Sequence, residues 1–432
     1  MTMGCVVEAG WHYAQAGIVP PARNVRLDFG GGNGSLGGPA HVALPAAVNA
    51  HDHGRAISTL AAGVADDVLE RWIPASQRVP CVDAGLEATV ALARMARAGI
   101  AATQICHDAA TLEAGISGAV AIAGAARKVG IRVEIALPVY DMNLDGYVSQ
   151  EDRLLGLPAS DITGAAGSRA AAAPIVEQIA AVEEAASRAE GGGVTVAFHA
   201  VGLPWCSPAL FSAVAERSMA TGRRVFMHLL ETGQQRRWAD AAYDSRPLHM
   251  LDEAGLLSDR LACAHGVHLR DSEIALLAER GVTVSVNTSS NLRLASGIAA
   301  VPDFVRAGLR FGLGIDSFGW SDHPDPWSEA RLCRLVHRGR GSDHSLDDSA
   351  VLTALSRGHR PGDLVLFDLD RLAPDRLEQA DPLALILARG SSAQVTDLLV
   401  EGRPVMRAGR VLGVDAEASE AELRARLRLP AR

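Results

Sequence analysis

Two histidines separated by one residue follow an apolar run near the start of the chain. The run covers 42–48, and the next five residues read Asn-Ala-His-Asp-His, which places His51 and His53 on either side of Asp52. An apolar run of this length is typical of a buried strand. Because side chains alternate along a strand, residues two apart point the same way. His51 and His53 can therefore share one metal ion at the strand's end, although core histidines would show the same spacing.

Later apolar runs also end in histidine or aspartate. These residues are His107, His199, His228, His265 and Asp316. Imidazole and carboxylate are ligands that suit zinc or ferrous iron, and neither the ligand types nor their spacing chooses between the two metals. The pattern predicts a metal site, provided that the fold brings these strand ends together.

Strand and helix patterns alternate through the middle of the chain and provide such a fold. The expected strands cover 43–50, 101–107, 132–137, 194–199, 224–229, 261–265, 282–287 and 311–315. Helical patterns between them cover 86–98, 112–128, 175–189, 209–221, 271–280 and 326–337. Eight strand and helix units predict an α/β fold of the (β/α)8 TIM-barrel type, in which the carboxyl ends of the strands meet at one rim. A doubly wound open sheet is the alternative.

The two ends of the chain predict a second, smaller unit. Strand and turn signals at 363–368, 397–405 and 410–412 follow one another without barrel helices between them, and a helix is expected at 417–427. We expect residues 1–42 and 341–432 to form a small composite β-sandwich beside a barrel of residues 43–340. The Gly/Ala-rich segment 159–173 is expected to be a loop on the barrel face.

Composition excludes several classes of protein. The formal charge of −9 and the pI near 5.9 disfavour nucleic acid or an anionic membrane as a partner. No run approaches the roughly 18–20 apolar residues of a spanning helix, and the first residues lack a signal-peptide pattern, so we expect a cytoplasmic protein. The six cysteines include no Cys-x-x-Cys pair, which argues against a disulfide framework or a zinc ribbon.

Five motifs in order resemble the amidohydrolase superfamily, and within it the branch of cytosine deaminase, adenosyl-homocysteine deaminase and the s-triazine hydrolases. The motifs are His51-Asp52-His53, Met227-His228-Leu229-Leu230-Glu231-Thr232, Ala264-His265-Gly266-Val267-His268-Leu269, Ser289 to Gly297, and Gly312-Leu313-Gly314-Ile315-Asp316-Ser317. The resemblance implies metal ligands at His51, His53, His228 and Asp316, and catalytic roles for Glu231, His265 and Asp316. It also makes a homodimer an expectation.

Chemistry at the residue level agrees with these roles. A divalent metal lowers the pKa of bound water and supplies hydroxide. Glu231 can move the proton of that water, and His265 can orient the hydroxide or stabilise negative charge on the substrate. Two-metal relatives commonly bridge their ions with a carbamylated lysine, whereas the single lysine here, Lys128, lies in an expected helix. We therefore predict one metal, with zinc or iron as its identity.

Candidate substrate contacts are less specific, because core or lid packing explains each of them equally well. A Trp offers a flat face on which a ring can stack, and Arg and His offer polar contacts. The candidates are Arg55, His107, His199, Trp205, Arg293 and Trp320.

The predicted function is hydrolysis of a carbon–nitrogen bond other than a peptide in a small molecule. The most concrete form is deamination of an amino-substituted N-heterocycle such as a pyrimidine, purine, pterin or triazine. An amide, urea or s-triazine substituent hydrolase with the same site is the enzymatic alternative. A catalytically inactive barrel scaffold is the other alternative, although scaffolds of this kind lose ligands and this chain keeps every expected position.

Overall fold

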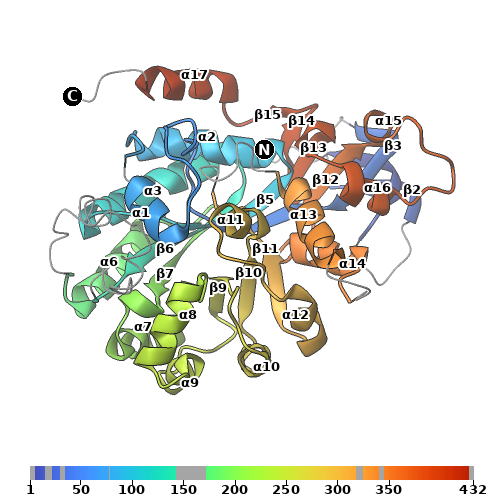
Figure 1. Ribbon diagram of the computed structural model, residues 1–432. Coiled ribbons are helices and arrows are strands. Elements are labelled where there is room, and N and C mark those ends of the chain that lie inside the picture. The colour runs from blue at the N-terminus through green and yellow to red at the C-terminus, as the bar shows by residue number, and fades with distance from the viewer. Residues whose placement is uncertain are drawn as a thin grey trace.

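Eight parallel strands form one sheet in which neighbours in space are neighbours in the chain (Figure 1). The computed structural model describes residues 5–14, 22–29, 35–76, 78–142, 172–317, 325–339 and 345–427. The strands are β4 (Ala47–Asp52), β5 (Ile100–Cys106), β6 (Arg132–Val139), β7 (Val194–Gly202), β8 (Val225–Leu229), β9 (Leu261–His265), β10 (Thr283–Val286) and β11 (Arg310–Leu313). The Asp316 amide donates to the His51 carbonyl at 3.0 Å, which links the last strand end to the first. The barrel prediction is confirmed, and the sequential strand order excludes a doubly wound sheet.

Helices cover the outside of the barrel. Those expected from the sequence are α2 (Ala84–Arg97), α3 (Leu112–Val129), α6 (Ile175–Ala189), α7 (Pro208–Thr221), α10 (Asp271–Glu279) and α13 (Pro326–Arg338). Local chemistry sets their limits. Thr111, for example, caps the start of α3 by accepting from the Ala114 amide at 3.1 Å, and Gly130 ends the helix in a left-handed conformation.

Shorter helices lie in the segments that connect the strands. They are α1 (Leu69–Ser76), the 3-10 turn η1 (Leu203–Trp205), α8 (Gly233–Ala242), α9 (Pro247–Glu253), α11 (Thr288–Arg293) and α12 (Val301–Ala307). The helices α1 and α11 pack together through Leu69, Trp72, Ile73 and Leu294. The segment after β4 is thereby fixed beside the segment after β10.

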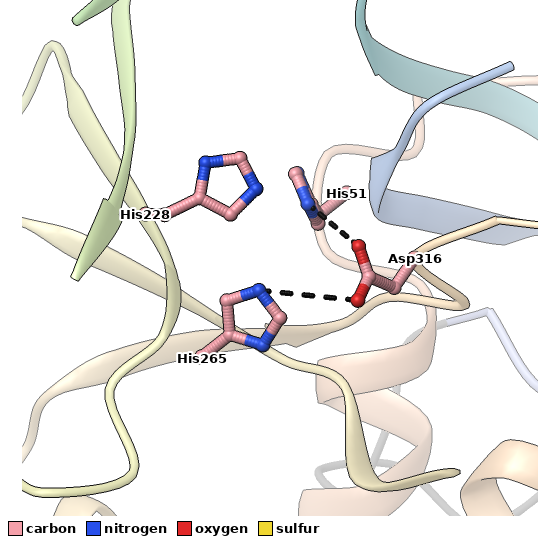
Figure 2. A group of neighbouring side chains, drawn as sticks. All are labelled: His51, His228, His265 and Asp316. Carbon is pink, nitrogen blue, oxygen red and sulfur yellow. Dashed lines mark ion pairs between the residues drawn. The ribbon is translucent and has the colours of Figure 1, made fainter. Parts of the chain in front are cut away.

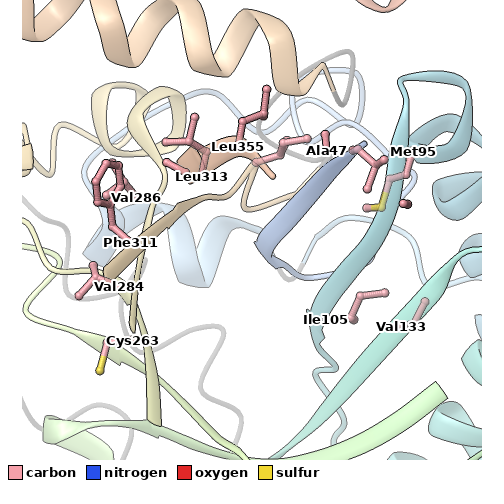
Figure 3. Close-up of a cluster of buried hydrophobic side chains, with 14 of the residues drawn as sticks. Ala47, Met95, Ile105, Val133, Cys263, Val284, Val286, Phe311, Leu313 and Leu355 are labelled. Atoms are coloured by element: carbon pink, nitrogen blue, oxygen red, sulfur yellow. The ribbon is translucent and has the colours of Figure 1, made fainter. Parts of the chain in front are cut away.

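The main apolar core lies between the strands and the surrounding helices. Figure 3 shows part of it, where Ile105 and Val133 from the strands share one cluster with Met95 of α2. The inside of the barrel is filled differently, mainly by small side chains. Cys106, Ala136, Ala197, Phe226 and Ala262 make up that inner cluster. Small inner residues leave room at the barrel's carboxyl end for a layer of polar side chains.

The two chain ends build a separate sheet, as expected, and its seven strands are hydrogen-bonded in one array. Their order is β15 (Arg410–Val411), β14 (Arg403–Arg407), β13 (Val395–Val400), β12 (Leu364–Asp368), β3 (Ser35–Pro45), β1 (Val6–His12) and β2 (Ala22–Asp28). In Figure 1 the blue and red strands lie side by side in this sheet. Strand β3 joins the two halves, because it pairs parallel with β1 and antiparallel with β12. The terminal helix α17 (Ala416–Leu427) packs on α2.

Three details differ from the sequence predictions. The expected strand 43–50 is the end of β3 followed by β4, because the chain passes from one sheet to the other at Ala46, and both strands are buried there. Helices α14 (Asp348–Leu355), α15 (Leu369–Leu372) and α16 (Pro382–Arg389) interrupt the region where only strands and turns were expected. The predicted loop 159–173 lies almost wholly outside the described residues. The domain boundaries at 42 and 341 stay predictions.

No helix in the part of the chain that the structure describes combines the length and the apolar character needed to cross a membrane.

Candidate metal centre

Three imidazoles and one carboxylate converge at the carboxyl end of the barrel (Figure 2). His51 lies on β4, His228 on β8 and His265 at the end of β9, and Asp316 follows β11. One ligand atom from each residue lies within 4.8 Å of the others. The side chains of His51, His265 and Asp316 are buried, and that of His228 is partly buried. The rim predicted from strand ends therefore brings these four residues together.

Asp316 is held from two sides. Its Oδ1 lies 2.9 Å from His51 Nε2, and its Oδ2 accepts a hydrogen bond from the Ser290 hydroxyl at 2.5 Å. His265 Nε2 lies 3.9 Å from Oδ2, which leaves space between the imidazole and the carboxylate. These contacts aim the carboxylate at the three rings.

Each of the three rings has its other nitrogen engaged outside the group. The Nδ1 atoms of His51 and His265 lie 3.0 Å and 2.8 Å from the side-chain oxygens of Gln104 and Asn291. His228 Nδ1 lies 3.2 Å from the Val201 carbonyl and 3.1 Å from His199 Nε2. Nε2 is then the atom of each ring that faces the shared space, an arrangement typical of metal-binding histidines.

The charge states also fit a cation. Burial lowers the pKa of His51, His228 and His265, which keeps the three imidazoles neutral with a lone pair available. Burial alone would raise the pKa of Asp316, but His265 and His51 hold it well below its ordinary value. Three neutral imidazoles and one carboxylate form a donor set for zinc or ferrous iron.

His53 lies at the edge of this group. Its Nε2 is 3.5 Å from Asp316 Oδ1, and its Nδ1 is 3.3 Å from Asp108 Oδ2. Burial opposes protonation of this ring, but the carboxylates of Asp108 and Asp316 raise the pKa of His53 to about 9. The predicted ligands His51, His53, His228 and Asp316 thus lie side by side, with His265 in contact. The choice of ligands among these residues stays a prediction.

Glu231 is buried directly beyond β8, next to the group. Its Oε2 lies 3.5 Å from His265 Nε2, and the Ser296 hydroxyl donates to its Oε1 at 3.4 Å. Burial raises the pKa of Glu231 well above its ordinary value, and the nearby carboxylates of Asp316 and Glu70 add to the effect. A carboxyl group that holds a proton near neutral pH suits general acid and base chemistry.

Three residues at the site adopt left-handed backbone conformations without being glycine. Leu230 has φ of 47°, His265 of 73° and Asp316 of 69°. Such conformations are unfavourable for side chains with a Cβ, and they cluster at functional sites. The sharp turns after β8, β9 and β11 place the polar side chains over the barrel.

The candidate substrate contacts occupy different places. His199 is buried against His228. Arg55 forms an ion pair with Glu87 of α2 at 2.9 Å, and Arg293 binds both oxygens of Asp66 at 2.9 Å.

The remaining candidates are His107, Trp205 and Trp320. The His107 ring packs against Gly118 of α3, away from the four residues, and Trp205 is buried in η1. Trp320 lies outside the described residues. Substrate roles for all six stay predictions.

Sequence reasoning missed several side chains that complete the site. Ser290 and Asn291 stood inside a recognised motif but received no role. Gln104 stands beside Thr103 in an otherwise apolar strand, and that amide was the available signal. Glu70 is buried and accepts a hydrogen bond from the Thr232 hydroxyl at 2.6 Å. Thr232 directly follows Glu231 in the sequence. The helix of Glu70, α1, was not predicted.

Comparison with known proteins places the chain in a family. Residues 42–356 match the model of the amidohydrolase family. A 5-methylthioadenosine/S-adenosylhomocysteine deaminase of Moorella thermoacetica is 28% identical over 410 residues, covering 89% of this chain and 86% of the relative. A 5'-deoxyadenosine deaminase of Methanopyrus kandleri is 26% identical over 413 residues, covering 88% and 84%.

Solved structures share the fold over nearly the whole chain. A zinc-bound adenosine deaminase from Xanthomonas campestris has a TM-score of 0.79 at 23% identity, with 99% of each chain covered. An Arthrobacter aurescens atrazine chlorohydrolase variant, complexed with zinc and atraton, has a TM-score of 0.80 at 20% identity, covering 98% of this chain and 100% of the other. The resemblance read from the motifs and the expectation of a metal-dependent hydrolase are confirmed. The chain belongs to the amidohydrolase family.

Proposed function

We propose that this chain removes an amino group from an aromatic N-heterocycle by hydrolysis, with adenine nucleosides as the first class to examine. The observation that carries the proposal is Glu231, a buried carboxyl of raised pKa placed 3.5 Å from His265 beside the imidazole group. Ammonia leaves an aromatic carbon readily only when it is protonated. A buried carboxyl whose pKa is raised can take up a proton and pass it to the leaving amine, which meets that requirement. The names of the deaminase relatives support the purine class.

Each protein group has a part in this reaction. The histidines and Asp316 would hold a divalent metal, which when bound would supply hydroxide near neutral pH. Glu231 accepts the water's proton and delivers it to the ring nitrogen or to the departing amine. His265, whose Nδ1 lies 2.8 Å from Asn291 Oδ1, keeps the lone pair of its Nε2 directed at the shared space, where it can accept a hydrogen bond from the attacking water and orient it. Asp316 accepts a hydrogen bond from the attacking water.

Release of ammonia tests the proposal. The protein is reconstituted with Zn²⁺ and incubated with adenosine, 5'-deoxyadenosine, methylthioadenosine, S-adenosylhomocysteine, guanine, cytosine, a pterin and an aminotriazine. We expect stoichiometric ammonia from at least one ring, and loss of activity on removal of the metal by a chelator. Turnover of an amide, a urea or a triazine with another leaving group, without ammonia from any aminated ring, would replace the proposal by the enzymatic alternative. A metal-loaded protein inactive on all of these would contradict both.

The relatives support only part of what we expected about partners and cellular location. A small-molecule substrate fits the deaminase relatives. The homodimer and the cytoplasmic location stay predictions from the sequence.

A further inference from the structure

Gln104 is a buried amide on the inner face of β5, with only 5% of its surface exposed. Small apolar side chains line the barrel interior close by, among them Cys106 and Ala136. An amide buried in such surroundings costs free energy unless both of its ends find partners. The contacts of Gln104 therefore indicate why an amide stands at this position.

Both ends of the amide are engaged, and the two partners fix its orientation. Gln104 Nε2 donates to the Cys106 sulfur at 3.2 Å. Its Oε1 lies 3.0 Å from His51 Nδ1, whereas the Cys106 sulfur is 3.9 Å from the same nitrogen. Since a carbonyl oxygen can only accept, His51 Nδ1 must carry the proton in this contact. The lone pair of His51 is then on Nε2, the atom that faces Asp316 at 2.9 Å.

We propose that Gln104 is a positioning residue that sets the tautomer and ring orientation of His51 for a divalent cation, with Cys106 holding the amide. The inference rests on the proposed metal centre but not on the identity of the substrate. Partners of this kind typically change metal affinity about 10- to 100-fold when they are removed. The side chain of Gln104 contacts His51 and Cys106, so its effect reaches the metal centre through His51.

The first experiment reads the tautomer without metal or substrate. Ring nitrogens of the metal-free protein are observed by ¹⁵N NMR, with the His51 signals assigned by their loss in His51→Asn. We expect a protonated Nδ1 in the wild type and in Gln104→Glu, which keeps an acceptor oxygen. In Gln104→Met, which has similar volume and no strong acceptor, we expect the Nδ1–H preference to be lost. A wild type protonated at Nε2, or a Gln104→Met variant with an unchanged tautomer, would overturn the proposal.

The second experiment measures metal binding. Zn²⁺ affinity is determined by competition with a chromophoric chelator, and the Co²⁺-substituted protein is compared by its visible spectrum. Gln104→Met should bind Zn²⁺ about 10- to 100-fold more weakly and show a changed Co²⁺ spectrum, while Gln104→Glu should stay close to the wild type. Equal affinities and spectra in all three proteins would contradict a positioning role.

A matched control separates positioning from general destabilisation. Thr103 is buried one residue earlier on β5 and faces the opposite side of the strand, and its hydroxyl donates to the Gln104 carbonyl at 3.3 Å. Thr103→Val should leave Zn²⁺ affinity and the Co²⁺ spectrum unchanged, and a loss equal to that of Gln104→Met would overturn the proposal. If Gln104→Met does not fold, Cys106→Ala replaces it, with a smaller loss of affinity expected and an unchanged affinity counting against the proposal. A wild type that binds no Zn²⁺ defeats the metal centre, whereas metal binding without ammonia release defeats only the deaminase.

Discussion

Single residues at the carboxyl end of the barrel are oriented by partners from other elements. Ser290 of α11 donates to Asp316, Asn291 lies against His265, and the Val201 carbonyl lies against His228. Such contacts give each side chain one preferred orientation, which would lower the cost of binding a metal at the proposed centre. Glu231 lies beside this group, and its burial together with the nearby carboxylates raises its pKa well above the ordinary value.

Replacement of Glu231 by Gln tests its role as proton carrier. Gln keeps the shape and the hydrogen-bonding oxygen but cannot transfer a proton. We expect Glu231→Gln to retain metal and to lower kcat by roughly 10² to 10⁴, measured as ammonia release with the best substrate. Arg293→Gln, which removes the ion pair with Asp66, is the control and should keep metal too. An unchanged kcat in Glu231→Gln would refute the assignment.

The residue types of the site were readable from the sequence because histidine and aspartate ended successive apolar runs. The structure unites His51, His228, His265 and Asp316 as that pattern predicted. Side-chain direction was not readable in the same way. His107 and Cys106 are adjacent at the end of β5, yet the sulfur points to His51 and the imidazole to Gly118. Side chains alternate between the two faces of a strand, and the strand's register decides which of two adjacent residues points into the barrel.

At the scale of elements, the close approach of α3 to the end of β5 depends on a glycine at the point of contact. A Cβ at Gly118 would lie 2.0 Å from His107 Nε2, whereas a Cβ at Gly124 of the same helix would meet nothing within 4 Å. Substitutions at Gly118 therefore test packing against His107, whereas substitutions at Gly124 test helix propensity alone. Gly118 allows α3 to approach the imidazole closely.

Alanine substitutions at these two positions should have opposite signs. Gly118→Ala should lower the free energy of unfolding by about 1–3 kcal/mol through overpacking. Gly124→Ala should raise it by about 0.5–1 kcal/mol, because alanine loses less backbone entropy in a helix. Urea unfolding followed by circular dichroism measures both. The same sign for both variants would show that His107 does not pack as described.

Element type was predicted well for the long strand and helix segments of the barrel, and less well where two strands run together or a helix is short. The alternating runs of the barrel gave strands and helices within a few residues of the observed limits. The run 43–50 concealed a change of sheet at Ala46, because residues on both sides of that point are equally apolar and buried. Helix α16 was missed although Asp381 caps it and Leu383, Ile386 and Leu387 follow helical spacing. The helix is only eight residues long, so its apolar spacing repeats too few times to be distinguished from a strand or loop.

At the scale of the molecule, one buried ion pair ties the barrel to the sheet formed by the chain ends. Both guanidinium nitrogens of Arg132, at the start of β6, bind Asp363, at 2.8 and 2.6 Å. Asp363 also accepts from the amides of Arg360 and Glu401. The pair lies at the amino end of the barrel strands, opposite the candidate site, on the barrel face that serves stability rather than chemistry.

Loss of this carboxylate should weaken the whole fold. Asp363→Ala leaves Arg132 buried without its partner and should lower the free energy of unfolding by about 3–5 kcal/mol. The exposed pair of Glu184 and Arg188, 3.1 Å apart, is the control, and Glu184→Ala should change stability by less than about 0.5 kcal/mol. Thermal and urea unfolding measure both. Similar small effects for the two variants would show that the buried pair does not join the units.

The metal content of the purified protein tests the central claim most directly. After reconstitution with Zn²⁺ and removal of excess ion, elemental analysis should give one equivalent per chain, and His228→Ala should retain far less. A single equivalent agrees with the convergence of His51, His228, His265 and Asp316 and with Lys128 standing in α3, away from the strand ends. Two equivalents per chain, no bound zinc, or full retention in His228→Ala would contradict the account.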